Sequence, residues 1–181
     1  MHPAHRRLAL IPLACFGLVF AQKIARDEPW QILWACHVAT LWMAAGLALG
    51  RRTWVEAATL FHLAAGLPGW LTDWIVLGST TASSVVSHVL TPVTGLWALG
   101  GPRFGRWAVP LAWGLQLVLL PLSLALTPAG SNINQARRVW GPLRATLPNH
   151  WWFAWLASLV VLGLALTAGA VICRRLTRPR A

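Results

Sequence analysis

The sequence has very few charged residues and almost no acidic ones. Only 10% of its 181 residues are charged, whereas about a quarter are charged in an average soluble domain. The acidic residues are Asp27, Glu28, Glu56 and Asp73. Because 57% of the residues are hydrophobic, the composition excludes an ordinary soluble domain and favours a protein that is buried in a membrane.

Cysteine is scarce and tyrosine is absent. The three cysteines, Cys15, Cys36 and Cys173, each lie inside an apolar run and show no CxxC spacing. This pattern predicts neither a disulfide framework nor a zinc site. The 13 Trp residues are typical of membrane proteins, in which the indole ring favours the interface between lipid and water.

The net charge of +11 comes from 15 Arg and Lys residues that punctuate the apolar runs. A basic patch with interleaved aromatic residues, which nucleic-acid binding requires, is missing from this pattern. Arginine pairs between apolar runs are instead typical of loops beside an anionic membrane surface. We therefore expect membrane lipids as partners and no nucleic acid.

Six apolar runs are long enough to predict an all-α, polytopic bundle of about six transmembrane helices in one domain. A spanning helix needs about 20 mostly apolar residues, because lipid cannot satisfy exposed backbone groups. The predicted helices cover residues 8–22, 30–49, 54–77, 83–99, 107–127 and 151–173. The short connections predict that consecutive helices pack as antiparallel neighbours. The longest connection, residues 128–150, is long enough to fold back over the membrane surface.

The first run has a second interpretation as a cleaved secretory signal. Arg6 and Arg7 precede a short apolar stretch that ends in Val19-Phe20-Ala21, an arrangement that resembles a signal with a cleavage site. We favour an uncleaved helix, because the chain continues directly into a second span.

The distribution of basic residues predicts the orientation of the helices. Of the 15 Arg and Lys residues, ten lie in the two termini and in the loops around Arg51 and Arg103, and five lie in the opposite loops. Cytoplasmic loops carry the excess of Arg and Lys. The prediction is therefore a multi-pass protein of a bacterial inner membrane with both termini in the cytoplasm.

Ionisable side chains within the runs mark the candidate site, because such groups are costly in lipid and usually face an interior cavity. In the predicted orientation, His37, Asp73 and His88 lie in the outer half of the membrane, with His62 near the midplane. Glu56 lies at the cytoplasmic end, where either an ion pair with Arg52 or simple solvation explains it.

Helical spacing adds a polar or small face to each of these helices. His37 shares a face with Thr40, and Asp73 shares one with Trp70. Pro68 and Pro92 interrupt their helices near these groups and free carbonyls that a cavity can use. The alternative interpretation is that these polar residues are ordinary hydrogen-bonding contacts between helices, which contribute about 0.6 kcal/mol each on average.

Several short motifs follow one another along the chain, namely Cys36-His37-x-x-Thr40, Thr72-Asp73-Trp74, Thr80-Thr81, Ser87-His88, Leu120-Pro121-Leu122-Ser123 and Asn132-Ile133-Asn134. Their order resembles that of a family of small, uncharacterised bacterial multi-helix membrane proteins over about residues 30–150. Thr40 stands where that family has Asn, and Leu124 where it has an aromatic residue. The resemblance implies a fold and a set of site residues, and it implies no particular reaction.

The first functional hypothesis is a membrane-embedded enzyme that acts on a lipid or hydrophobic small molecule at the outer leaflet. His37 or His88 would be the general base, and Asp73 would orient its imidazole. Cys36 is a conceivable nucleophile, but we interpret it as a packing residue, because it points about 100° away from His37 around the helix. The residues expected to bind the substrate are Thr40, Trp70, Ser123, Asn132 and Asn134.

Two further hypotheses come from different classes of protein. A non-catalytic membrane subunit or assembly factor would use the polar faces to contact a partner membrane protein. A haem or metal protein would use His37 and His88 as ligands. The residue types identify no cofactor.

Overall fold

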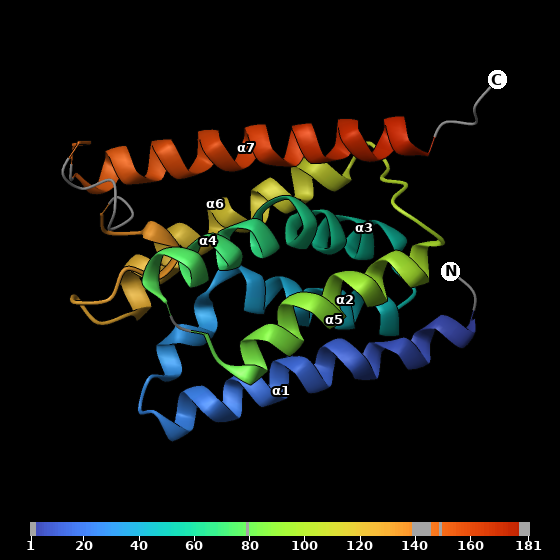
Figure 1. Ribbon diagram of the computed structural model, residues 1–181, viewed down its shortest axis with the longest axis horizontal. Coiled ribbons are helices and arrows are strands. Elements are labelled where there is room, and N and C mark those ends of the chain that lie inside the picture. Colours follow the sequence, from blue (N-terminus) through green and yellow to red (C-terminus); the bar gives the residue numbers. More distant parts are fainter. Residues whose placement is uncertain (1–2, 79, 139–145, 149, 178–181) are drawn as a thin grey trace.

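The computed structural model describes residues 3–78, 80–138, 146–148 and 150–177, and it is all-helical with no strand among them (Figure 1). The helices are α1 (Leu10–Ala25), α2 (Ala35–Ala48), α3 (Arg52–Phe61), α4 (Leu67–Leu77), α5 (Ala82–Leu99), α6 (Ala108–Leu126) and α7 (Trp151–Leu176). Short 3-10 helices cover Pro3–Ala9, Pro29–Leu33 and Ile133–Gln135, and one π-helical turn covers His62–Gly66. The predicted all-α helix bundle is confirmed.

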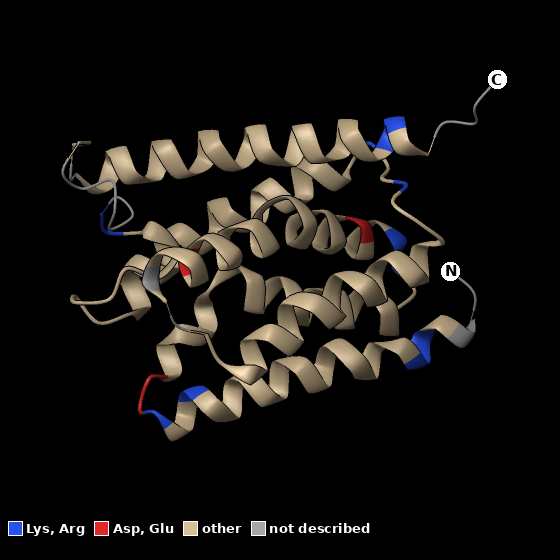
Figure 2. Cartoon of the chain, in the orientation of Figure 1, with Lys and Arg blue, Asp and Glu red and all other residues tan. Residues whose placement is uncertain are grey.

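Four helical segments are long and apolar enough to cross a membrane. They are His5–Ala25, Ala82–Leu99, Ala108–Leu126 and Trp151–Leu176. Among the described residues, the charged ones lie toward the two ends of the bundle, and the middle of the bundle carries few of them (Figure 2). Both chain termini lie at one end (Figure 1), which we call the terminal end; the other is the opposite end.

Helix α2 is shorter than the predicted span of 30–49. Residues Pro29–Leu33 form a 3-10 helix, and Trp34 has an extended backbone with ψ of 132° that separates this turn from α2. Pro29 fixes the first turn and has no amide hydrogen. With 14 residues, α2 is about 21 Å long, so it crosses only part of the thickness of a membrane.

The predicted helix 54–77 is a single stretch interrupted by the π-helical turn. Pro68 cannot donate an amide hydrogen to the carbonyl of Ala64, so the regular hydrogen-bond ladder fails at this point. The chain widens into a π turn over His62–Gly66 immediately before Pro68, which is a recognised solution to such an interruption. The turn divides a buried helix, α3, from a more exposed one, α4.

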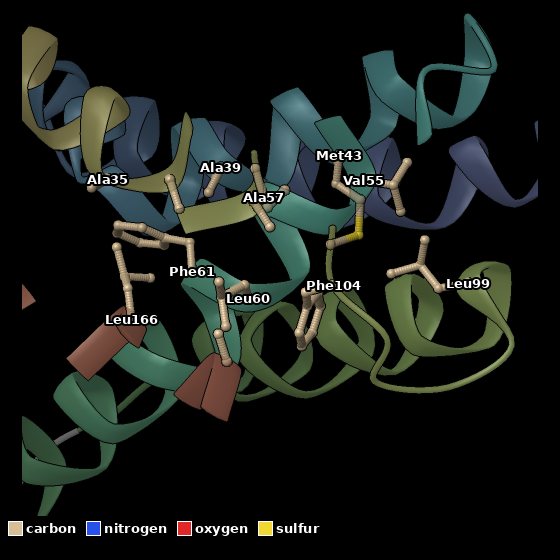
Figure 3. Close-up of a cluster of buried hydrophobic side chains, with 14 of the residues drawn as sticks. Ala35, Ala39, Met43, Val55, Ala57, Leu60, Phe61, Leu99, Phe104 and Leu166 are labelled. Atoms are coloured by element: carbon tan, nitrogen blue, oxygen red, sulfur yellow. The ribbon is translucent and has the colours of Figure 1, made fainter. Parts of the chain in front are cut away.

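The core lies around α3. Seven of the ten residues of α3 are buried, and they pack against α2, α5, α6 and α7. Figure 3 shows apolar side chains from several of these helices gathered in one cluster, with Met43 and Leu60 among them. Small residues allow the close approach, since a Cβ atom at Gly95 would meet Thr59 and Met43.

The order of packing differs from the expectation that consecutive helices are neighbours. Within the described residues, α5 packs mainly against α1 and α3 and not against the following helix α6, which packs against α3 and α7. The buried helix α3 offers two packing faces, and α5 and α6 pack on opposite faces of it.

Helix α1 is an integral part of the bundle. It packs against α5 and α2, and Pro12, Cys15 and Val19 are buried in these contacts. Near its end, Gln22 accepts hydrogen bonds from the hydroxyl groups of Thr81 and Ser83 at the start of α5. The uncleaved first helix stays a prediction, and these contacts are what cleavage would remove.

Candidate functional site

A polar pocket of about 300 Å³ opens at the opposite end of the bundle, where α1 ends and α5 begins. Lys23 in the last turn of α1 and Arg26 directly after this helix contribute two positive charges, and α4 contributes Asp73 between two indoles. The lining residues are Lys23, Arg26, Trp70, Asp73, Trp74, Thr80, Thr81 and Ser84. Ligand pockets begin at about this volume, and this one combines both signs of charge with hydroxyl groups and aromatic surface.

Side-chain hydrogen bonds hold the three walls of the pocket together. The indole of Trp70 donates to the hydroxyl of Thr80 at 3.0 Å, which ties α4 to its connection with α5. The hydroxyl of Thr81 donates to Gln22 at 3.2 Å, which ties the start of α5 to α1. Thr81 also accepts from the amide of Ser84 and thereby caps α5. The shape of the pocket is therefore fixed by side chains from all three helices.

Trp70 separates the pocket from a buried histidine. The ring of His88 stacks on Trp70 with centroids 5.2 Å apart and an interplanar angle of 14°. Trp74 packs against Trp70 with a centroid distance of 5.3 Å. The Nδ1 atom of His88 lies 2.9 Å from the carbonyl oxygen of Ser84 and donates to it. In the neutral imidazole this leaves Nε2 as the acceptor.

A second histidine lies deeper in the bundle. His62 is fully buried, and its ring lies edge-on to His88 with centroids 6.3 Å apart. The hydroxyl of Thr40 donates to the carbonyl of Cys36 at 2.9 Å, so Thr40 accepts the hydrogen bond from Nε2 of His62 at 3.2 Å. The Nδ1 atom of His62 has no hydrogen-bond partner. A buried orphan acceptor costs stability, and such atoms are concentrated at functional positions.

Asn134 belongs to a different cluster, at the start of α2. Its side-chain oxygen accepts the amide hydrogen of Ala35 at 2.8 Å, across 99 positions of sequence. Its side-chain nitrogen donates to the carbonyl of Leu33 and to the hydroxyl of Ser123. Asn134 thus caps a helix that has no local side-chain cap. Its φ of 54° lies in the left-handed region, which Asn tolerates better than most residues.

Asn132 organises the loop that carries Asn134. Its side-chain oxygen accepts the amide hydrogens of Arg137 and Arg138. Arg137 then donates to the carbonyls of Leu124 and Thr127 at the end of α6, where a cation satisfies unpaired carbonyl groups. The side chains of both asparagines are therefore bonded within the protein, and the described part of the loop inserts into the bundle, with Ile133 and Asn134 buried.

His37 lies in the first turn of α2, near Asn134. It is buried, and its Nδ1 atom donates to the carbonyl of Gln31 at 3.1 Å. The predicted site residues therefore divide into two groups. Asp73 and Trp70 line the pocket, with His88 behind Trp70 and Thr40 reached through His62. His37, Ser123 and Asn134 surround the start of α2, and Asn132 lies in the loop beside them.

Sequence reasoning missed the two basic residues of the pocket. Lys23 and Arg26 were interpreted only as charges that set the orientation, and Lys23 in the structure donates to the side-chain oxygen of Gln31. Lys23 and Arg26 are three residues apart at the end of a helix, and this spacing places them on one face. It is the sequence feature that could have indicated a shared basic site. The long connection 128–150 is described only in part, and its residues Trp140 and Arg144 lie outside the described residues.

The expected ion pair of Glu56 is confirmed, with Arg52 donating to it at 2.8 Å. Its second oxygen accepts the amide hydrogen of Gly105 at 3.0 Å. Glu56 therefore fastens the connection between α5 and α6 at the terminal end, whereas the pocket lies at the opposite end of the bundle. This is a structural role, and it explains why an acid is buried there.

No group of three or more His, Cys, Asp or Glu side chains suited to holding a metal ion occurs among the described residues. His62 and His88 lie edge-on to each other, and His88 is covered on one face by Trp70. The hypothesis of a haem held by His37 and His88 gains no support from a shared cavity, because neither residue lines the pocket.

Comparison of the chain with models of protein families, with curated proteins and with solved structures finds no match.

Proposed function

We propose that the chain is a multi-pass protein of a bacterial inner membrane, with both termini in the cytoplasm, that binds a lipid or another hydrophobic small molecule through its polar group in the pocket between α1, α4 and α5. The observation that carries the proposal is the pocket itself. It places two cations, one carboxylate and three side-chain hydroxyls beside two indoles at one end of a membrane bundle. Amphipathic ligands need this combination of polar and aromatic surface.

The orientation supports an outward-facing pocket. Arg6, Arg7, Arg174 and Arg175 belong to helices that begin or end at the terminal end, where Figure 2 shows much of the basic charge. By the excess of arginine, that end faces the cytoplasm. The pocket then opens toward the periplasm, at the level of the outer lipid headgroups.

The surface beside the pocket suits the apolar part of such a ligand. Leu71, Ile75 and Val76 of α4 are exposed, and they continue from the pocket along the same helix. A ligand with its polar group between Lys23 and Asp73 can therefore leave its hydrocarbon part in lipid. It does not need a deep cavity.

Binding is favoured over catalysis by the position of His88. A general base must come within hydrogen-bond reach of the proton that it removes, and the Trp70 ring lies between His88 and the pocket. Direct contact between His88 and a ligand would require a rearrangement of this wall, because His88 does not line the pocket and reaches it only through its neighbours Trp70 and Ser84. The enzyme hypothesis therefore depends on an additional step, whereas binding uses the pocket as it stands.

Site-specific photo-crosslinking in cells tests the proposal. A photoreactive residue at position 74, in the pocket, is compared with one at position 97, because Trp97 is also an exposed tryptophan but lies toward the terminal end of α5. We expect more lipid adducts at position 74 than at position 97. Equal labelling would overturn the proposal, and a protein adduct at position 74 would favour the membrane-subunit alternative.

The orientation is tested separately by cysteine accessibility. After replacement of the three native cysteines, single Thr80→Cys and Arg103→Cys variants are labelled in intact cells with a thiol reagent that does not cross the inner membrane. We expect labelling at position 80 and protection at position 103. The reverse pattern would place the pocket on the cytoplasmic side.

A further inference from the structure

The charges of the pocket lie on different helices. Lys23 and Arg26 stand one turn apart at the end of α1, and Asp73 stands on α4 between Trp70 and Trp74. The structure therefore presents positive charge on one wall and negative charge on another, and the three helices that carry these walls are tied together by hydrogen bonds.

This separation selects the charge pattern of a ligand. A purely anionic group would meet the two cations and also the carboxylate of Asp73, which disfavours it by like-charge repulsion. A purely cationic group would be attracted by Asp73 but repelled by Lys23 and Arg26. A group that carries both charges a few ångströms apart can pair each with its opposite.

The remaining polar and aromatic groups fit the same pattern. Thr80 accepts the hydrogen bond from Trp70, so its own hydroxyl hydrogen can be donated to an anionic oxygen. The faces of indole rings attract cations, and the exposed Trp74 lies next to Asp73 in sequence. An ammonium group near Asp73 would therefore have both a carboxylate and an aromatic surface beside it.

We propose that the pocket binds a zwitterionic phospholipid headgroup of the phosphoethanolamine type, with its phosphate between Lys23, Arg26 and Thr80 and its ammonium group at Asp73 beside Trp74. This inference rests on the proposed function, because it names the headgroup that the pocket takes. The acyl chains lie outside the pocket along the exposed apolar residues of α4.

The test compares two lipids that differ only in the headgroup. The purified full-length protein is equilibrated in detergent with equal amounts of phosphatidylethanolamine and phosphatidylglycerol with identical acyl chains, and the retained lipid is measured by native mass spectrometry. The wild type is expected to retain phosphatidylethanolamine in about three- to tenfold excess, as one weak to moderate ion pair provides. The Asp73→Asn variant is expected to lose this excess, and Asp73→Glu to keep most of it.

Asp27→Asn is the matched control. Asp27 is an acid at the same end of α1, it does not line the pocket, and its φ of 54° suits asparagine. This variant should keep the wild-type lipid ratio. An equal loss of selectivity in Asp27→Asn and Asp73→Asn would overturn the proposal, because it would reveal a general effect of charge.

Lys23→Gln tests the phosphate contact. It should weaken the retention of both lipids, since both carry a phosphate, and Lys23→Arg should restore it. Unchanged retention in Lys23→Gln would overturn the assignment of the phosphate. Each variant is first shown to match the wild type in helical content and elution, so that misfolding is separated from loss of binding.

A soluble competitor distinguishes a lipid from a free ligand. Glycerophosphoethanolamine has the same headgroup without acyl chains, and it should displace the lipid only at concentrations at least about tenfold higher, because burial of even two methylene groups contributes more than this factor. Equal potency would overturn the lipid as the source of the headgroup. Lipid adducts at position 74 without any headgroup preference would overturn this inference and leave the proposed function standing, whereas a lack of selective adducts would overturn both.

Discussion

Helices α3 and α4 are joined by a π-helical turn into one continuous stretch of chain, yet they differ in almost every physical respect. Seven of the ten α3 residues are buried, whereas no described side chain of α4 is buried. Only the π-helical turn separates the two. The comparison teaches that one predicted span can be scaffold in its first half and ligand-binding surface in its second, with the transition set by a single proline.

The largest change in stability is expected from adding one methyl group where α5 packs against α3. A Cβ atom in Gly95→Ala would overlap Thr59 of α3 and Met43 of α2, and overpacking of a tight core costs about 3 kcal/mol. Gly69→Ala places the same methyl group on α4, where nothing lies within 4 Å, so it should stabilise the helix by about 0.5–1 kcal/mol. Unfolding in mixed micelles of increasing denaturing detergent measures both. Equal effects would remove the distinction between α3 and α4.

The next effect concerns the scaffold that holds α2 against α3. Asn134→Ala removes three side-chain hydrogen bonds and leaves the buried amide of Ala35 without a partner, so we expect a loss of about 2 kcal/mol. Asn134→Gly removes the same bonds but accepts a positive φ without strain, and should recover about 1 kcal/mol of it. Ser131→Ala, in an exposed part of the same loop, is the control. A loss below about 0.5 kcal/mol in Asn134→Ala would show that the cap is dispensable.

A smaller loss of stability is expected when Glu56, near the start of α3, is substituted. Glu56→Ala breaks the pair with Arg52 and leaves the amide of Gly105 unpaired, which should cost about 1–2 kcal/mol. Glu56→Gln keeps an oxygen for Gly105 and should cost less, because Arg52 is half exposed and contributes little. The same unfolding titration ranks the two variants, and a larger loss in Glu56→Gln would show that the charge dominates.

The smallest effect is expected at the junction itself. His62→Leu removes the buried orphan Nδ1 atom, while Thr40 keeps its bond to the carbonyl of Cys36. Replacing a half-satisfied polar group by an apolar one of similar size is nearly neutral, so stability should change by less than about 1 kcal/mol. A loss above about 3 kcal/mol in the unfolding titration would mean that His62 is an essential contact between helices.

Helical spacing was enough to predict much of this arrangement. The positions of His37 and Thr40 on one inward face follow from the spacing of polar residues, and both are buried in the structure. The insertion of Asn134 beneath α2 could not be predicted, because its partner lies 99 positions away. The π turn also escaped prediction, since a proline in an apolar run indicates an interruption without specifying its geometry.

The sequence predicts the pocket only in part, because some of its walls come from helices that are distant in the sequence. Asp73 and Trp70 were expected on one face of one helix, which spacing can establish. Lys23 and Arg26 join them because α1 packs on α5, and no local pattern reveals which helices pack together. Contacts between distant segments are decided by tertiary packing, so the sequence alone does not reveal the wall formed by α1.

Hydrogen–deuterium exchange of α3 and α4 tests the central claim most directly. The measurement follows the backbone amides of the protein in detergent, with and without added phosphatidylethanolamine. The account predicts slow exchange in α3 under both conditions, together with faster exchange in α4 that slows when the lipid is added, because a ligand in the pocket would order that helix. Exchange in α4 that is as slow as in α3, or that does not respond to the lipid, would contradict the account.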